Sequence, residues 1–266
     1  MNADAATAVS SPGDAAGQHT SDLSRLIVAW QHPVSRLISP VGLLDFGDQS
    51  YRFRYYRQAL TTPDFRPFVG FPDLHLRYSS TELFPFFQQR VMHSRRPDYL
   101  RYIRSLALPA NADPWEQLAR SGGRRSGDTI QLFPEPRVAA DGHTECIFLV
   151  HGVRHIERAY DSLVQRRIDK LERGDQLSLS RDSENPVNSE AVFVCTLDGH
   201  PLGWVPNLLL DYIHSTGQMP GLRITVEHTN GEEAPYHFRL IVKLEGRVPS
   251  GYMPFTGPDW EFLSDD

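Results

Sequence analysis

Residues 184–194, ENPVNSEAVFV, place a rigid polar corner directly before an apolar strand. Asn185, Pro186 and Asn188 are turn formers, because proline fixes φ and asparagine side chains bond to nearby backbone. Residues 191–194 are typical of a buried strand. The corner either only turns the chain or also holds a ligand with its two side-chain amides. The residues by themselves leave both interpretations open.

A second group with binding chemistry is a set of arginines between residues 90 and 125. Glycines at positions 122 and 123 precede two of them, and arginines spaced by glycine can approach phosphates closely. An acidic protein surface would satisfy the same side chains equally well. An ordinary solvated helical face is the remaining alternative. The candidate partner-binding residues are Arg90, Arg96, Arg101, Arg124 and Arg125.

The chain carries none of the common catalytic sequence motifs. The phosphate-loop, dinucleotide, zinc-hydrolase and nucleophile-elbow motifs are all missing from the sequence. His151 and His155 are predicted to share one strand, about 13 Å apart at roughly 3.3 Å per residue, which is too far for a common metal. Asp182 and Glu184 are expected to be solvated turn charges. We therefore expect a protein that is not an enzyme, with no catalytic residue, no metal site and no cofactor.

The composition is that of a folded protein with two differently charged parts. Hydrophobic residues make up 40% and charged residues 23% of the 266 residues, so wholesale disorder is excluded. The net charge of −6 argues against a generally basic, nucleic-acid-coating protein. Residues 24–137 hold 16 Arg against 10 acidic residues, +6, and residues 146–246 hold 10 basic against 14 acidic residues, −4. This split predicts two modules.

The cysteines and the chain ends indicate a cytoplasmic protein. Cys146 and Cys195 sit in apolar runs, which predicts buried, inert thiols in a reducing compartment. Neither a signal peptide nor a run long and apolar enough to span a membrane is recognisable. Residues 1–21 are small and polar and are expected to form a disordered leader.

The first module is predicted to be a small α+β unit. Strands are expected over residues 25–30, 41–46 and 51–56, the last alternating aromatic and arginine side chains. Proline and acidic residues favour helix starts near Arg96 and at Asp113, and Gly122 is a helix stop. A closing strand over 127–136 precedes an expected linker at 137–145.

The second module is predicted to be rich in strands. A long strand is expected over residues 146–156, a helix over about 160–171, and strands over 175–182, 191–197 and 201–206. A short helix at 207–215 and a hairpin of 222–228 with 236–244 follow. Residues 247–266 are expected to form a loosely packed tail. The predicted fold class is α+β, with two small domains, the second an OB-like barrel with one or two helices.

Residues 146–246 resemble a HIRAN domain, a small barrel of certain DNA translocases and of stand-alone bacterial proteins. The resemblance rests on HGVRHI (151–156), on residues 171–194 and on GHPLGWVPNLLLDYI (199–213). HIRAN domains are similar to OB folds, and some bind the 3′ end of single-stranded DNA. The resemblance therefore implies single-stranded DNA as a ligand.

Position by position, the resemblance implies a site for a terminal nucleotide. Arg154 would meet a phosphate, and His155 stands where an aromatic ring often stacks on a base. Val187 and Asn188 fill positions that DNA-end binders of the family give to Tyr and Asp, so this chain lacks one stacking ring and one carboxylate there. The implied site consists of Arg154, His155, Asn185, Val187, Asn188 and Trp204.

Residues 24–137 resemble the N-terminal subdomain of HipA-type kinases. The residues that carry this resemblance are VGLLDFGDQSYRFRYY (41–56), LFPFFQQR (83–90) and residues 113–134. The kinase catalytic domain has no counterpart in the chain. The resemblance implies an accessory, antitoxin-like partner of a separate HipA-like kinase, with the HIRAN domain sensing nucleic acid. The alternative is a protein that binds single-stranded DNA 3′ ends in DNA repair or phage defence.

Overall fold

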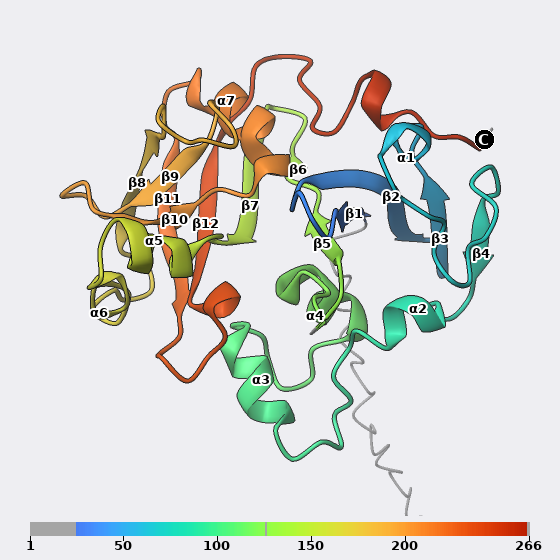
Figure 1. Cartoon of the computed structure of the whole chain (residues 1–266), viewed down its shortest axis with the longest axis horizontal. Helices are drawn as coiled ribbons and strands as arrows, with labels where there is room; N and C mark the ends of the chain where they lie inside the picture. Colours follow the sequence, from blue (N-terminus) through green and yellow to red (C-terminus); the bar gives the residue numbers. More distant parts are fainter. Residues whose placement is uncertain (1–24, 126, 265–266) are drawn as a thin grey trace, which may run out of the picture.

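The computed structural model describes residues 25–125 and 127–264, and its strands form two antiparallel sheets that lie side by side (Figure 1). The predicted mixed α+β class is confirmed. The expected leader at residues 1–21 lies outside the described residues. The elements of the first part are β1 (Arg25–Gln31), β2 (Ile38–Gly47), β3 (Ser50–Tyr55), α1 (Gln58–Thr61), β4 (Tyr78–Ser80), α2 (Pro85–Gln88), α3 (Tyr99–Ser105), α4 (Pro114–Ser121) and β5 (Ile130–Pro134).

The first sheet has the strand order β4-β3-β2-β1-β5 and is organised by the β2–β3 hairpin. The two residues of its turn, Asp48 and Gln49, both have positive φ, 52° and 57°. That geometry matches the twist of a two-residue hairpin loop. The strand β3 points Phe53 and Tyr55 into the core, as the alternation of its side chains predicts.

Helix α4 begins and ends where its sequence predicts. The Asp113 carboxylate accepts a hydrogen bond from the Glu116 backbone N–H, and the Glu116 carboxylate accepts one from the Asp113 backbone N–H. Together they form a capping box. Pro114 is the first helical residue, and Gly122 ends the helix in the left-handed conformation with φ 67°. This end directs residues 122–124 toward the second sheet.

The proline-rich loop that follows α1 is held by one tyrosine. Tyr55 donates its hydroxyl to the Phe71 carbonyl oxygen at 2.9 Å and accepts from the Phe68 backbone N–H at 2.8 Å. Phe53 packs against both phenylalanines, with ring centroids 6.1 Å and 4.5 Å away. The irregular loop is therefore part of the aromatic core of the first sheet.

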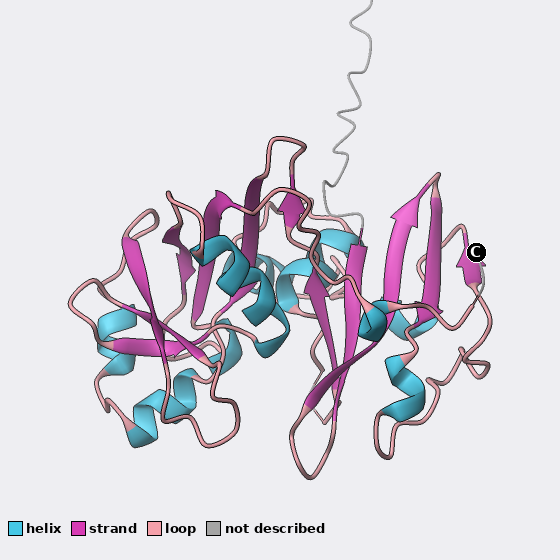
Figure 2. Ribbon diagram, turned by 90° about the horizontal axis from the view of Figure 1, so that it is seen from above, coloured by secondary structure: helices cyan, strands magenta, loops and turns pink. Residues whose placement is uncertain are grey.

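The second sheet is built from residues 137–247 and has short helices beside its strands (Figure 2). The predicted linker at 137–145 is wrong, because it contains a short strand and the start of the next one. The elements are β6 (Arg137–Val138), β7 (His143–Leu149), α5 (Val153–Ala159), α6 (Val164–Ile168), β8 (Gln176–Arg181), β9 (Val192–Cys195), β10 (Pro201–Trp204), η1 (Asn207–Leu209), α7 (Leu210–Gly217), β11 (Arg223–Thr229), η2 (Tyr236–Phe238) and β12 (Leu240–Arg247).

The strand predicted over residues 146–156 is wrong beyond β7. Gly152 adopts φ 74° and precedes α5, so the chain leaves the extended conformation there. The helix predicted over about 160–171 is present only as α6, and Tyr160 lies before it, between α5 and α6. His155 consequently lies on a helix and not on a strand.

The second sheet curls without closing. Its strand order is β10-β9-β8-β11-β12-β7-β6, and the described strands form no closed barrel. One isolated antiparallel bridge, between His151 and Trp204, links the chain just after β7 to β10. Both backbone hydrogen bonds of this bridge are formed, with N···O distances of 2.9 Å and 2.8 Å. The predicted barrel is therefore not closed among the described strands, and the bridge between His151 and Trp204 joins the two sides of the gap.

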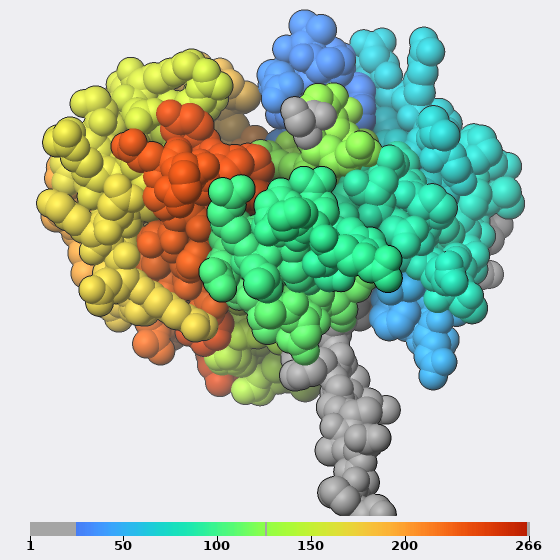
Figure 3. Space-filling view, turned by 90° about the horizontal axis from the view of Figure 1, so that it is seen from below, coloured from blue at the N-terminus to red at the C-terminus, as the bar shows by residue number. Residues whose placement is uncertain are grey.

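The two parts of the chain contact each other through α3 and the segment between β11 and β12. In Figure 3 the green segment that contains α3 lies against the orange-red segment before β12. The Asn230 side chain donates to the Ser105 carbonyl oxygen at 2.8 Å, and the rings of Tyr102 and Phe238 are 6.2 Å apart. These contacts hold α3 of the first part against the β11–β12 loop.

The C-terminal segment is more ordered than its sequence predicts. It runs from β12 back across the first sheet (Figure 1), where Phe262 forms a bridge with Tyr56 and stacks on its ring at 5.1 Å. The Leu263 backbone N–H donates to the Tyr55 carbonyl oxygen at 3.1 Å. The expectation of a loosely packed tail is wrong, because aromatic side chains anchor it.

Arg90 is a structural residue and not part of an outer binding face. Its side chain is only 3% exposed, its Nη2 lies 2.6 Å from Asp128 Oδ2, and its Nη1 donates to the Gly123 carbonyl oxygen at 3.1 Å. Burial lowers the pKa of Arg90, and Asp128 opposes that effect. The prediction that Arg90 contacts a partner conflicts with this burial.

We expect Arg90→Ala to lower the free energy of unfolding by about 3 kcal/mol, because it leaves the Asp128 carboxylate without its cation. Urea unfolding followed by circular dichroism measures this change. The matched control is Arg96→Ala, since Arg96 forms an exposed pair with Asp98 and its removal should leave the stability nearly unchanged. Equal effects of both substitutions would contradict the structural role of Arg90.

Candidate nucleic-acid interface

The corner at residues 185–188 is held by its own asparagine. The Asn185 Oδ1 atom accepts from the backbone N–H groups of Val187 at 3.0 Å and Asn188 at 3.1 Å. This is an asparagine-stabilised turn, which is what the Asn-Pro-x-Asn sequence predicts. Val187 projects from its tip and is 71% exposed. The corner is therefore rigid without any ligand.

A buried carboxylate joins the corner to the sheet. Asp182 is only 4% exposed, and its Oδ2 accepts from Asn185 Nδ2 and from Trp204 Nε1, both at 2.9 Å. Hydrogen bonds to a charged acceptor are stronger than neutral ones. The expectation that Asp182 is a solvated turn charge is wrong, because Asp182 links β8, the corner and β10. Glu184, by contrast, is exposed.

Three aromatic side chains gather beside this carboxylate, and we call Tyr160, Phe193 and Trp204 the aromatic cluster. Trp204 and Phe193 are cross-strand partners on β10 and β9, with ring centroids 5.0 Å apart. Tyr160 meets them edge-on, 5.8 Å from Trp204 and 5.6 Å from Phe193. Tyr160 is 52% exposed, and the other two rings are partly exposed. The cluster therefore offers aromatic surface to a flat ligand.

Arg154 and His155 lie on α5, just after the contact between Gly152 and Trp204. A Cβ on Gly152 would stand 2.5 Å from Trp204 Cε3, so only glycine fits there. Arg154 and His155 are both exposed. The Arg154 guanidinium lies 6.0 Å from the Tyr236 ring centroid. Arg154 was predicted to lie on the strand over residues 146–156, and the structure places it instead in the first turn of a helix.

The structure therefore brings together only part of the site that the HIRAN resemblance implies. Asn185, Asn188 and Trp204 converge through the corner and Asp182, and Val187 lies at the exposed tip. Arg154 and His155 are on α5. The residues that flank this helix in the sequence, Gly152 and Tyr160, both contact Trp204. No direct contact joins Arg154 to the corner among the described residues.

Three residues of the site escaped sequence reasoning. Phe193 alternates with the buried Val192 and Val194 and so faces outward, a signal that the strand pattern contains. Tyr160 fell at the start of the helix predicted over about 160–171, whereas the structure places it outside any helix, between α5 and α6. Asp182 carries no local sign of burial, because its partner Trp204 is 22 positions away.

The arginines of the first part do not form one outward-facing set. Arg96, Arg101 and Arg125 are exposed, and Arg125 donates to Gln89 Oε1 at 2.7 Å. Arg124 is partly buried between the two sheets, near His151. Only the three exposed residues remain available to an external partner.

Metal and thiol chemistry are not indicated within the described residues. They contain no group of three or more His, Cys, Asp and Glu side chains placed to hold a metal ion. Cys146 and Cys195 are buried and free, and burial raises the pKa of Cys146 to about 12 and that of Cys195 to about 11. Such thiols are poor nucleophiles, in line with the sequence prediction. No helix within the described ranges has the length and apolar character needed to cross a membrane.

Comparison with known proteins gives limited similarity. No protein-family model and no curated protein matches the chain. Among solved structures, a Lactobacillus plantarum protein is 20% identical over 40% of this chain and 100% of its own, with a TM-score of 0.30. The HIRAN domain of human HLTF is 16% identical over 42% of this chain and 84% of its own, with a TM-score of 0.28. At these TM-scores the similarities carry no argument about function.

A HIRAN domain is thus a structural neighbour of the chain, and nothing in these comparisons supports a HipA-like module. The HipA resemblance of residues 24–137 stays a prediction from the sequence. So do the boundaries of the two domains, which were placed at residues 24–137 and 146–246.

We expect Asp182→Ala to destabilise the fold by about 1–3 kcal/mol, because it removes the buried carboxylate that accepts hydrogen bonds from the partly exposed Asn185 and Trp204 side chains. Chemical denaturation measures the loss. Asp182→Asn keeps one acceptor oxygen and should cost less, and Glu184→Ala, two residues away and exposed, should cost almost nothing. The linking role of Asp182 would be refuted if Asp182→Ala and Glu184→Ala had the same effect.

Proposed function

We propose that the chain binds single-stranded DNA at a free 3′ end, with the terminal base on the aromatic cluster and the sugar at the 185–188 corner. The observation that carries this proposal is the exposed ring of Tyr160 beside the partly exposed rings of Phe193 and Trp204. Stacking of a base on an aromatic side chain contributes about 1–3 kcal/mol and does not depend strongly on the base.

The corner offers a ligand a hydrogen-bond donor and no free acceptor among the asparagine side chains. The Asn185 side chain is occupied by Asp182 and by backbone N–H groups, and Asn188 Oδ1 accepts from the Glu190 backbone at 3.0 Å. The Asn188 Nδ2 group makes no hydrogen bond with the described residues and is left as a donor. It would therefore donate to a sugar or phosphate oxygen, in place of the acceptor role that a carboxylate at this position would have.

Charge around the corner favours a hydroxyl over a terminal phosphate. Asp182, Glu184 and Glu190 lie within or beside it, and Arg181 and His214 both engage Glu190. A 3′-phosphate would bring up to two further negative charges close to these carboxylates. The exposed cations of α5, Arg154 and Arg158, are placed to meet backbone phosphates instead. The expected ligand is a short single strand with an unmodified 3′ end.

We expect Tyr160→Ala to weaken binding of a fluorescein-labelled single-stranded oligonucleotide about tenfold, in the range that loss of one stacked ring predicts. Fluorescence anisotropy of the full chain measures the dissociation constant. Tyr160→Phe keeps the ring and should retain affinity. Arg154→Ala should cost about 1–3 kcal/mol by removing a phosphate contact.

The choice of DNA end tests the proposal itself. A 3′-hydroxyl oligonucleotide should bind more tightly than the same strand with a 3′-phosphate or a circular single strand. Equal affinity for all three would contradict end binding, and the absence of saturable binding to any of them would overturn the proposed function.

An accessory role beside a HipA-like kinase is a separate proposal that rests on sequence resemblance and on the exposed Arg96, Arg101 and Arg125. These side chains could meet an acidic protein surface. Native expression with a HipA-like kinase and affinity purification tests it. Co-purification that is lost in Arg101→Glu/Arg125→Glu would support the proposal, and no co-purification would count against it.

A further inference from the structure

A groove of about 480 Å³ lies where the two parts of the chain meet, between α3 and the β11–β12 loop. Figures 1 and 3 show these two segments side by side. We call it the junction groove, and its main lining residues are Arg101, Tyr102, Arg104, His228, Glu233 and Phe238. Its volume falls within the range of roughly 300–1,000 Å³ that small-molecule sites occupy, and such sites are frequent where two units of a protein meet. The junction groove is therefore large enough for an organic ligand.

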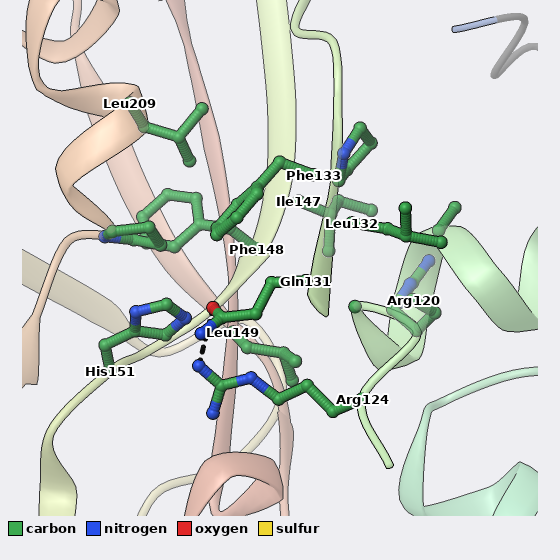
Figure 4. A pocket seen from close by; sticks show the side chains of 14 residues that line it. Arg120, Arg124, Gln131, Leu132, Phe133, Ile147, Phe148, Leu149, His151 and Leu209 are labelled. Carbon is green, nitrogen blue, oxygen red and sulfur yellow. Dashed lines mark hydrogen bonds between the residues drawn. The ribbon is translucent and has the colours of Figure 1, made fainter. Parts of the chain in front are cut away.

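The cavity between the two sheets is too small for such a ligand. It has a volume of about 30 Å³, and Arg124, Gln131 and His151 are among the residues that line it (Figure 4). The Arg124 guanidinium donates to Gln131 Oε1 at 2.7 Å at one side of this cavity (Figure 4). The space has room for about two water molecules. Of these two hollows, only the junction groove has the size of an organic ligand.

Asn230 holds the two sides of the junction groove together. Its Nδ2 donates to the Ser105 carbonyl oxygen at 2.8 Å on one side and to the Phe238 carbonyl oxygen at 2.6 Å on the other. Its Oδ1 accepts from His228 Nε2 at 3.2 Å, since an amide oxygen cannot donate. The Tyr102 and Phe238 rings meet edge-on, with centroids 6.2 Å apart. The groove is therefore preformed, with an aromatic surface between two hydrogen-bonded sides.

The α3 side of the junction groove carries two uncompensated arginines. Arg101 and Arg104 are three residues apart on the helix, so they lie on the same side of it. Both are exposed, and neither forms an ion pair or a side-chain hydrogen bond with the described residues. Asp98 also lines the groove, but both of its carboxylate oxygens accept from Arg96 at 3.0 Å. The two guanidinium groups therefore remain available to an anionic group of a ligand.

The loop side of the junction groove offers a carboxylate. Glu233 is exposed and forms no ion pair with the described residues. A Cβ on Gly231 would stand 2.5 Å from Glu233 Oε2, so the carboxylate lies directly against the Gly231 backbone, which also lines the groove. An ionised carboxylate only accepts hydrogen bonds, and it therefore suits the hydroxyl groups of a ligand. The two sides of the groove thus select different groups of one molecule.

We propose that the junction groove binds a nucleoside 5′-monophosphate, with its phosphate at Arg101 and Arg104 and a ribose hydroxyl at Glu233. The base lies against the aromatic surface of Tyr102 and Phe238. Guanidinium groups bind phosphate oxygens through paired N–H donors. An inorganic phosphate would leave the carboxylate and the rings unused, and a free amino acid would fill only part of the groove. The proposal is separate from DNA binding, because none of these residues belongs to the aromatic cluster or the corner.

A nucleotide in the junction groove would connect the two parts of the molecule. Arg101 and Arg104 belong to α3 of the first part, whereas Glu233 lies in the loop between β11 and β12 of the second. A ligand that binds only the folded arrangement raises its stability by mass action. The melting temperature of the full chain should therefore rise by about 5 °C when the nucleotide is present at about 100 times its dissociation constant.

Isothermal titration calorimetry of the full chain tests the proposal with each of the four common ribonucleoside 5′-monophosphates, and separately with the matching nucleosides and with sodium phosphate, at constant ionic strength. Wild type should bind at least one of the nucleotides saturably, one per chain. The nucleoside alone and phosphate alone should bind at least about tenfold more weakly, because each lacks one set of contacts.

Three variants assign the binding to the junction groove. Arg104→Gln should weaken nucleotide binding at least about tenfold by removing a charged phosphate contact. Glu233→Ala should weaken it more mildly, by about threefold to tenfold, through loss of one hydroxyl acceptor. The matched control is Arg95→Gln, because Arg95 is exposed, forms no ion pair with the described residues and does not line the groove. It should bind as wild type does.

The proposal would be overturned if wild type bound none of the four nucleotides, if phosphate alone bound as tightly as they do, or if Arg104→Gln and Arg95→Gln had equal affinities. Tyr160→Ala should leave nucleotide binding unchanged. Loss of nucleotide binding in Tyr160→Ala would place the nucleotide on the aromatic cluster and overturn the assignment to the junction groove. Arg104→Gln should leave the affinity for single-stranded DNA unchanged, so the two proposals fail separately.

Discussion

The backbone bridge between His151 and Trp204 is the contact on which the candidate nucleic-acid interface depends. It brings β10 against the chain that leaves β7, and glycine is required on both sides of it. A Cβ on Gly203 would stand 2.5 Å from the His151 carbonyl oxygen, and one on Gly152 would stand 2.5 Å from the Trp204 ring. Trp204 thereby meets Phe193, Tyr160 and the corner, while His151 lines the cavity between the sheets. One close approach thus positions both the aromatic cluster and one wall of the cavity between the sheets.

Three arginines of the chain differ in the partners that compensate their charge. Arg90 is neutralised by Asp128, and Arg239 is surrounded by the Gln165 side chain and the carbonyl oxygens of Glu232 and Ala234. Arg124 differs from both, since one amide oxygen is its hydrogen-bond partner among the described residues. Buried cations are normally compensated. The first two arrangements stabilise local structure, whereas the partly buried Arg124 is held by Gln131 at the junction of the two sheets.

Much of the local structure follows from sequence patterns. The helix start at Asp113, the stop at Gly122, the alternation in β3 and the apolar run of β9 were each sufficient to predict an element. The strand expected over residues 146–156 failed because an apolar run does not reveal the positive φ of a glycine within it. The helix expected over about 160–171 is confirmed only at Val164–Ile168, and Tyr160, its expected first residue, packs instead on rings from β9 and β10.

The sequence alone determined the mixed α+β class, the self-supporting turn at Asn185 and most strands of the second sheet, because these depend on local periodicity and turn chemistry. Tertiary structure decided which polar side chains are buried. Asp182 and Arg90 are both charged residues with no local sign of burial, yet each is enclosed beside a partner more than 20 positions away. The free energy of a charge depends on its three-dimensional surroundings, and those surroundings come from segments that the local pattern does not connect.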